Sequence, residues 1–108
     1  MVIKIASIQK TLPAGSGETE IGAIAGKVGK VLNILEILPV TPTNSYLYIY
    51  VESERVAEIH GDLISKDNRR ILVNWSIGGG QMLRVTGTNG STTSSIVGCL
   101  IVYDEISA

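Results

Sequence analysis

The feature that most constrains this chain is a repeated alternation of apolar and polar residues, with β-branched side chains at many apolar positions. The 108 residues include 15 Ile, 10 Val and 8 Thr. A period of two places successive side chains on opposite faces of an extended backbone, and β-branched residues favour that backbone. Residues 46–51, Tyr-Leu-Tyr-Ile-Tyr-Val, show the alternation most clearly. The pattern therefore predicts half-buried β-strands.

Eight such runs are separated by glycine, proline, asparagine or charged residues, which interrupt regular structure. The predicted strands span residues 2–9, 20–25, 30–38, 45–52, 55–64, 70–77, 81–88 and 94–106. Residues 28–38 also fit a helix, because apolar residues recur there every three or four positions. The nearby glycines, the Ile and Val content and the neighbouring strands favour a strand, and the helix stays the alternative.

Eight short strands in about 100 residues are typical of an antiparallel β-sandwich or barrel. We expect one domain over residues 1–108, because a chain of this length supports a single core. An eight-stranded, jelly-roll-like sandwich is the first choice. An immunoglobulin-like sandwich is the second, but the chain has one Cys and so lacks the Cys…Trp…Cys spacing of that fold.

Tight turns are predicted at three of the breaks. Ser53-Glu54 is short enough for a two-residue turn, and Gly78-Gly79-Gly80 supplies residues that accept a positive φ. Asn89-Gly90 is a further strong turn signal. We therefore expect three hairpins between consecutive strands.

Two of the predicted strands are apolar on both faces. In the strand at 94–106 the two faces carry Ile96, Leu100 and Val102 against Val97, Cys99, Ile101 and Tyr103. In the strand at 30–38 they carry Val31, Leu35 and Ile37 against Leu32, Ile34 and Leu38. A two-layer sandwich has one interior, and monomers rarely expose large apolar patches. We expect another copy of the chain to cover the second face, unless a loop such as 10–19 folds over it.

The most informative aromatic feature is a stripe of three tyrosines, Tyr46, Tyr48 and Tyr50, on one face of a single strand. Tyrosine rings suit protein interfaces, and exposed rings also stack on sugars. The predicted homo-oligomer interface joins this stripe to the strands with two apolar faces: Tyr46, Tyr48, Tyr50, Leu32, Ile34, Val97, Ile101 and Tyr103. Packing within the sheet face is one alternative for the stripe, and a glycan-binding surface made of the same three tyrosines is the other.

Residues that carry catalysis or bind metals are sparse. Glu58 and Asp62 flank His60, but no second His or Cys is present to complete a zinc site. We therefore predict a surface histidine, no metal, no cofactor and no enzymatic activity. Cys99 lies in an apolar run, which predicts a buried and inert thiol. The three glycines at 78–80 lack the Lys-Ser/Thr ending of a phosphate-binding loop.

The charge balance and the hydropathy exclude further classes. Nine Lys and Arg oppose ten Asp and Glu, and the basic residues are scattered, so nucleic-acid binding is not expected. No run approaches the roughly 18 apolar residues of a membrane span, so we expect no membrane insertion. The first residues resemble a strand more than a signal peptide, and none is expected.

Residues 46–105 resemble the small jelly-roll structural proteins of bacteriophages and archaeal viruses, such as capsid decoration proteins and spike or tail head domains. The resemblance is carried by the Tyr-Leu-Tyr-Ile-Tyr-Val strand with its tight turn, by residues 78–85 and 88–91, and by a last apolar strand ending in Tyr103-Asp-Glu. It implies a non-enzymatic virion component, assembled in the host cytoplasm as a trimer together with other virion structural proteins. A similar hairpin style occurs in carbohydrate-binding modules, which makes glycans the alternative partner.

Overall fold

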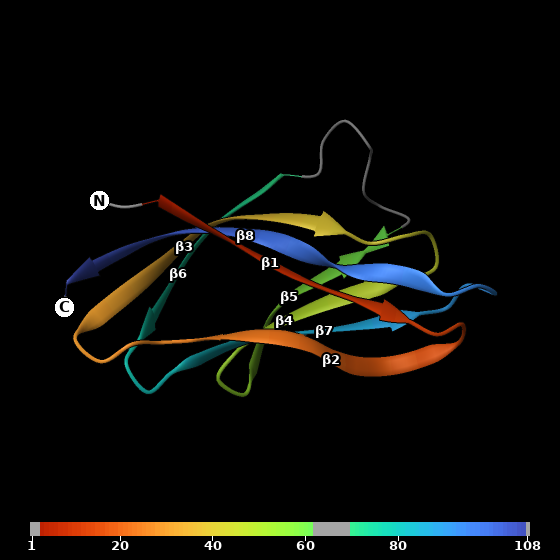
Figure 1. Cartoon of the computed structure of the whole chain (residues 1–108), viewed down its shortest axis with the longest axis horizontal. Helices are drawn as coiled ribbons and strands as arrows, with labels where there is room; N and C mark the ends of the chain where they lie inside the picture. Colours follow the sequence, from red (N-terminus) through yellow and green to blue (C-terminus); the bar gives the residue numbers. More distant parts are fainter. Residues whose placement is uncertain (1–2, 62–69, 108) are drawn as a thin grey trace.

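In a computed structural model of the chain, which describes residues 3–61 and 70–107, eight β-strands account for most of the backbone (Figure 1). Their bounds are β1 Ile3–Leu12, β2 Ser16–Ala25, β3 Lys30–Val40, β4 Tyr46–Val51, β5 Glu54–His60, β6 Ile71–Gly78, β7 Met82–Asn89 and β8 Ser95–Ser107. The strand prediction for 28–38 is confirmed by β3. The predicted strand at 55–64 is confirmed as far as His60, and its end at 62–64 lies outside the described residues.

The strands form two four-stranded antiparallel sheets. The first sheet has the order β1-β8-β3-β6, and the second sheet has the order β2-β7-β4-β5. The pairs β1–β8, β2–β7, β3–β6 and β4–β5 are nested, so the chain has the connectivity of one long hairpin rolled into two layers. This is the jelly-roll arrangement, and the predicted fold class is confirmed.

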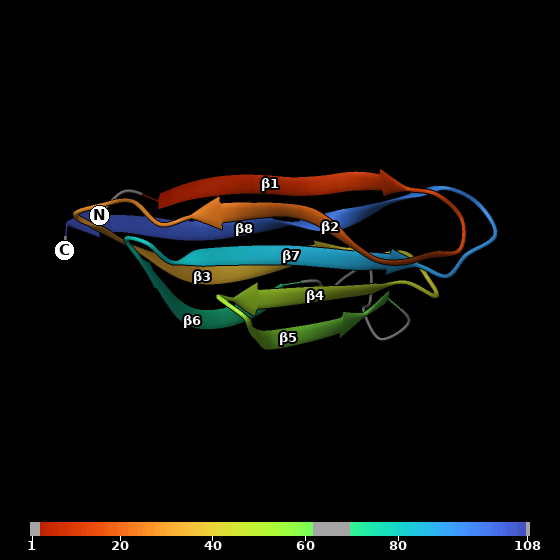
Figure 2. The ribbon, with the colours of Figure 1, turned by 90° about the horizontal axis from the view of Figure 1, so that it is seen from below.

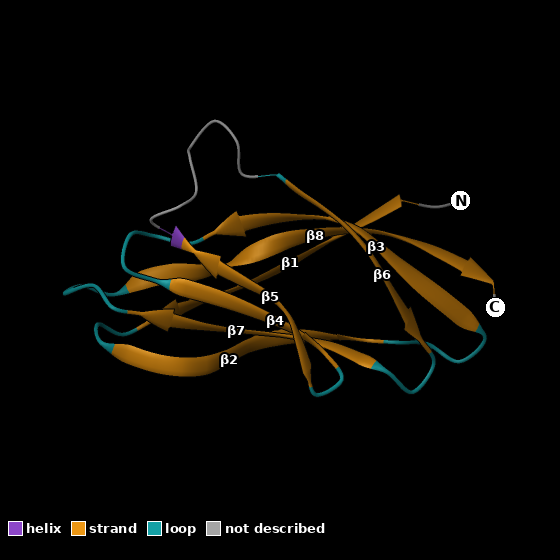
Figure 3. Ribbon diagram, turned by 180° about the vertical axis from the view of Figure 1, so that it is seen from behind, coloured by secondary structure: helices purple, strands orange, loops and turns teal. Residues whose placement is uncertain are grey.

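Apart from the β5–β6 connection, which lies outside the described residues, the connections lie at the two ends of the sandwich (Figure 3). One predicted hairpin is confirmed: β4 and β5 pair directly, and Glu52 in the turn between them has a φ of 59°. The other two are wrong, because the glycines at 78–80 and Asn89-Gly90 each join strands of different sheets. A turn signal marks a reversal of the chain, but it does not state whether the next strand pairs with the last or crosses to the other layer.

The core lies between the sheets and consists almost entirely of branched aliphatic side chains. It contains Ile8, Leu12, Leu32, Ile34, Ile37, Leu47, Ile49, Ile59, Ile77, Leu83, Val85, Val97, Cys99 and Ile101. A register shift between Ile34 and Glu36 interrupts the alternation of β3. As a result Ile37 shares the inner face with Leu32 and Ile34, although strict alternation predicts that it faces outward.

The structure corrects the predicted interface at four positions. Leu32, Ile34, Val97 and Ile101 are buried between the two sheets and present no surface to another molecule. Tyr103 is partly buried and packs against the same core. Both faces of β3 and β8 are apolar, so the pattern alone does not identify which face the second sheet covers.

A matched pair of valine truncations tests this core. Val85 is fully buried in β7, whereas Val28, in the turn between β2 and β3, is 95% exposed. We expect Val85→Ala to lower the free energy of unfolding by about 2–3 kcal/mol, because it removes buried hydrocarbon and leaves a cavity. Val28→Ala should change it by less than about 0.5 kcal/mol. Urea unfolding measures both, and equal effects would contradict the described core.

Candidate functional site

The two outer faces of the sandwich differ in chemistry, and the outer face of the first sheet is the apolar one. We call it the apolar face. Its exposed aliphatic side chains are Ile3, Ile5, Val40, Leu72, Ile96, Leu100 and Ile106. Among the described residues these are seven of the ten large hydrophobic side chains that are exposed. Single exposed hydrophobic residues are ordinary on a protein surface, but a gathered set marks an interaction surface.

The strand register shows how these side chains are spread over the face. One row crosses all four strands, from Ile5 in β1 through Val102 in β8 and Glu36 in β3 to Leu72 in β6. Ile5 and Leu72, at the two ends of this row, are 67% and 70% exposed. The apolar face therefore extends across the full width of the sheet.

Polar groups on the apolar face mostly pair with one another. Glu36 forms an ion pair with Arg70, and the Ser76 hydroxyl donates to Asn33 Oδ1 at 3.2 Å. Asp104 is nearly buried, and its Oδ1 has no hydrogen-bond partner among the described residues. Ser7, Gln9 and Thr11 on the outer side of β1 are also exposed, so polar side chains interrupt the hydrocarbon of this face.

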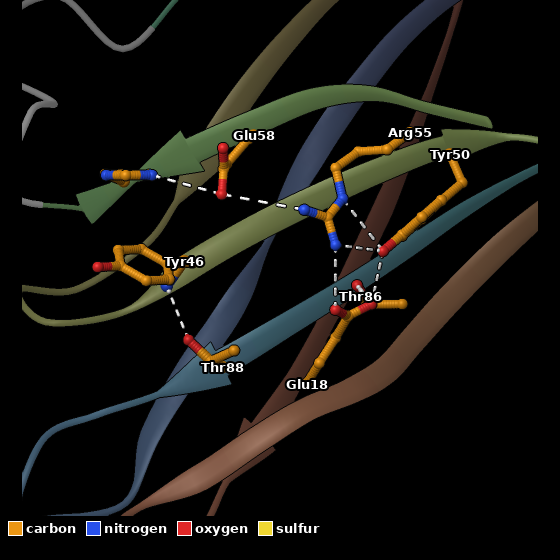
Figure 4. Close-up of polar contacts among 8 residues, drawn as sticks. Glu18, Tyr46, Tyr50, Arg55, Glu58, Thr86 and Thr88 are labelled. Carbon is orange, nitrogen blue, oxygen red and sulfur yellow. Dashed lines mark hydrogen bonds and ion pairs between the residues drawn. The ribbon is translucent and has the colours of Figure 1, made fainter.

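The outer face of the second sheet carries the tyrosine stripe, and its polar side chains form a strap across the sheet (Figure 4). The strap takes Glu18, Thr86, Tyr50 and Arg55 from β2, β7, β4 and β5. Glu18 Oε2 accepts hydrogen bonds from the Tyr50 hydroxyl at 2.7 Å and from Thr86 Oγ1 at 2.9 Å. Arg55 Nη2 donates to the Tyr50 oxygen at 2.9 Å and lies 3.4 Å from Glu18 Oε1. The strap thus connects all four strands of the second sheet.

The three tyrosines differ in how much of each side chain a ligand can reach. Tyr48 is only 9% exposed, and the Arg55 guanidinium lies 4.2 Å from its ring centroid. Burial raises the pKa of the Tyr48 hydroxyl. The Tyr50 hydroxyl is engaged in the strap. Tyr46 alone is well exposed, at 39%, and its ring lies 4.2 Å from that of His60.

His60, Cys99 and the possible metal ligands are the remaining candidate groups. His60 Nε2 lies 3.7 Å from Glu58 Oε1, while Asp62 lies outside the described residues. Burial raises the pKa of the Cys99 thiol to about 12, which agrees with the predicted inert thiol. Within residues 3–61 and 70–107, no three His, Cys, Asp or Glu side chains gather as metal ligands. The same residues contain no helix of the length and hydropathy needed to cross a membrane.

The structure does not bring the predicted interface residues together. The tyrosine stripe lies on the second sheet, and the other five predicted residues face the core from the first sheet. The residues of the apolar face are absent from the predicted interface, although Ile96 and Leu100 form one of the two apolar faces of the predicted strand at 94–106, and Ile3 and Ile5 alternate with Lys4 and Ala6 in another. That alternation is the signal in the sequence, but it does not tell which of the two faces is covered.

The strap makes a prediction about pH. The Tyr50 hydroxyl, which donates to the carboxylate, holds the pKa of Glu18 below its ordinary value of 4.5. The stabilisation is therefore present above pH 4.5 and is lost as the pH falls through the lower pKa of the folded state. We expect Glu18→Gln to lower the free energy of unfolding at neutral pH by less than about 1 kcal/mol, because the strap is exposed.

The measurement is urea unfolding of wild type and Glu18→Gln from neutral pH to pH 3. The difference between them should shrink as the pH falls. Glu54→Gln, at an exposed position of β5 in the same sheet, is the matched control and should follow wild type throughout. A difference that does not change with pH would show that the carboxylate charge is not what stabilises the strap.

Comparisons with protein families and with curated proteins add no family assignment to the fold described above. No protein-family model matches the chain, and no curated protein matches it either. The two outer faces and the strand edges are therefore the features from which a function can be inferred.

Proposed function

We propose that this chain is a non-enzymatic structural domain that associates with copies of itself through the apolar face. The observation that carries the proposal is the gathering of seven exposed aliphatic side chains on one outer sheet face. Water in contact with such a face is costly, and a second protein surface removes that cost. The opposite face bears the strap and the tyrosines, so association through the apolar face leaves a polar surface outward.

The free energies of burial and of association indicate that a stable contact requires the whole apolar face. Fully burying an aliphatic side chain is worth about 1.5–3 kcal/mol, and covering the exposed part of one gives roughly 1 kcal/mol. Seven such side chains on each of two copies therefore give a gain comparable to the association cost of about 4–15 kcal/mol. A contact through only two or three of them would be transient.

The alternative proposal, a carbohydrate-binding module, has less support. It requires open aromatic rings on which a sugar can stack. Arg55 covers the Tyr48 ring, and the Tyr50 hydroxyl is bonded to both Glu18 and Arg55. Tyr46 is left as the one well-exposed ring of the stripe, and a single ring is a weak sugar platform.

We further propose that the assembly is a virion component, formed in the host cytoplasm together with other virion structural proteins. Two arguments support this: the resemblance of residues 46–105 to viral jelly-roll proteins, and the use of the eight-stranded jelly roll in viral capsids. The same fold also occurs in lectins and cupins, so the topology alone does not select among them. The apolar face favours a structural role, because a structural subunit requires stable self-association.

The test of self-association is light scattering after size exclusion, at several protein concentrations. Wild type should have a fixed mass above that of the 11.5 kDa chain. Leu100→Lys places a charge in the middle of the apolar face and should shift the protein to the monomer, because burying an unpaired charge is costly. Tyr46→Lys, on the opposite face, is the matched control and should keep the mass of wild type.

Circular dichroism of each variant checks that the fold is retained. A wild-type protein that is monomeric at every concentration would overturn the proposed self-association. A folded Leu100→Lys variant that keeps the wild-type mass would show that the apolar face is not the contact.

A further inference from the structure

The sandwich has four edge strands, and three of them are protected against pairing with another chain. Edge strands commonly avoid such pairing through bulges and charged side chains. β2 has register shifts at 16–19 and 20–22 and carries Glu18 and Glu20. β5 has a register shift opposite Ile49 and Tyr50 and carries Glu54, Arg55 and Glu58. β6 has a shift opposite Ile34 and Glu36 and begins next to Arg70.

The fourth edge strand, β1, is the least protected of the four, since its two lysines, Lys4 and Lys10, are its only protective feature. All ten of its residues pair with β8 without a register shift, from Ile3 opposite Asp104 to Leu12 opposite Ser95. It carries neither proline nor an acidic residue, and Glu105 forms an ion pair with its Lys4. Lys10 is the one charge on β1 for which the described residues provide no ion pair. A long, regular edge with little charge is a template for another strand.

We propose that two copies of this chain join along β1 in antiparallel pairing, so that their first sheets become one continuous eight-stranded sheet. This inference rests on the proposed self-association and specifies one of its contacts. β1 lies along one margin of the molecule, and β5 and β6 lie along the opposite margin (Figure 2). The pairing adds main-chain hydrogen bonds at the edge, whereas the apolar face contributes side-chain burial.

A second copy fits this edge better than a foreign strand for two reasons. Antiparallel pairing across a two-fold axis lets the same ten residues supply both halves of the contact. The apolar face also reaches this edge in the first half of β1, where Ile3 and Ile5 are 52% and 67% exposed, whereas the second half presents the polar residues Ser7, Gln9 and Thr11. Pairing of β1 with its copy moves Ile3 and Ile5 from the margin into the joined sheet.

The pleat limits where the two-fold axis lies. Residues directly opposite each other in an antiparallel pair share a face, and a slip of one residue exchanges the faces. For the two apolar faces to lie on the same side of the joined sheet, the two-fold axis must pass midway between the two copies of one residue. The residues nearest the middle of β1 are Ser7 and Ile8. The two copies of Lys10 are then four residues apart with the axis at Ile8 and six apart with the axis at Ser7, or about 13–20 Å, at 3.3–3.4 Å per residue. This exceeds the screening length of about 8 Å at physiological salt. The axis at Ser7 places each Lys10 opposite the copy's Lys4, and since like charges opposite each other are destabilising, the axis at Ile8 is favoured.

Cysteine cross-linking of the whole protein tests the contact. Ser7 and Gln9 are exposed on the outer side of β1. With the axis at Ile8, each lies diagonally across from its own copy, with Cβ atoms about 8 Å apart. With the axis at Ser7, the Cβ atoms of the two copies of residue 7 are about 5 Å apart and those of residue 9 are about 14 Å apart. Ser7→Cys and Gln9→Cys are treated with a short bis-maleimide. Ser76→Cys is the matched control, since Ser76 is exposed on the same sheet in the opposite edge strand, β6. The native Cys99 is buried and provides the background in wild type.

We expect cross-linked dimer from Ser7→Cys in a yield several times that from Ser76→Cys. Gln9→Cys should give a similar yield with the axis at Ile8 and a lower yield with the axis at Ser7. Amide hydrogen exchange gives a second readout: protection of residues 3–12 should increase with protein concentration, and that of β6 should not. If wild type is oligomeric but β1 shows neither result, the β1 contact is overturned and self-association stands. If wild type is monomeric and no position cross-links above background, both proposals fail.

Discussion

A two-layer sandwich has one interior, and this constraint determines how the faces of the molecule are used. β3 and β8 lie in the middle of the first sheet and carry apolar residues on both sides. The second sheet covers their inner side, where Leu32, Ile34, Val97 and Ile101 complete the core. No further layer covers the outer side in the described part of the chain. The surplus of hydrocarbon is therefore a property of the fold, because no rearrangement of two sheets buries both sides.

The second sheet satisfies the constraint of a single interior, because only its inner side is apolar. Its inner side is as apolar as that of the first sheet, but its outer side is polar, and Glu18, Thr86, Tyr50 and Arg55 bond to one another across its four strands. Arg55 also lies over the Tyr48 ring and shields it from water. The polar residues and bulges that suit this sheet to solvent also protect its edge strands from pairing. In the first sheet, β1 has no bulge and no acidic residue.

The sequence predicts the strands well and the relations between strands poorly, and the reason is physical. Alternation identifies which residues share a face, and so Leu47 and Ile49 are correctly separated from the tyrosines. It does not reveal the bulge after Ile34, since an extra residue changes the phase without changing the composition. Nor does it select the inner face when both are apolar, which is why buried residues of β3 and β8 were assigned to an interface. The strap was not predicted because its four residues are far apart in the chain and meet only after the sheet has formed.

The proposed contacts also constrain the symmetry of an assembly. A cyclic trimer of equivalent chains has no two-fold axis, whereas antiparallel pairing of β1 with its own copy requires one. The trimer implied by the resemblance and the β1 contact are therefore compatible in dihedral symmetry, where two trimers are joined by two-fold contacts into a hexamer. In that arrangement the apolar faces pack around the three-fold axis and β1 joins the two layers. Two distinct contacts on one sheet, one from side chains and one from the main chain, are thus sufficient to close an assembly and leave the tyrosine side available to other partners.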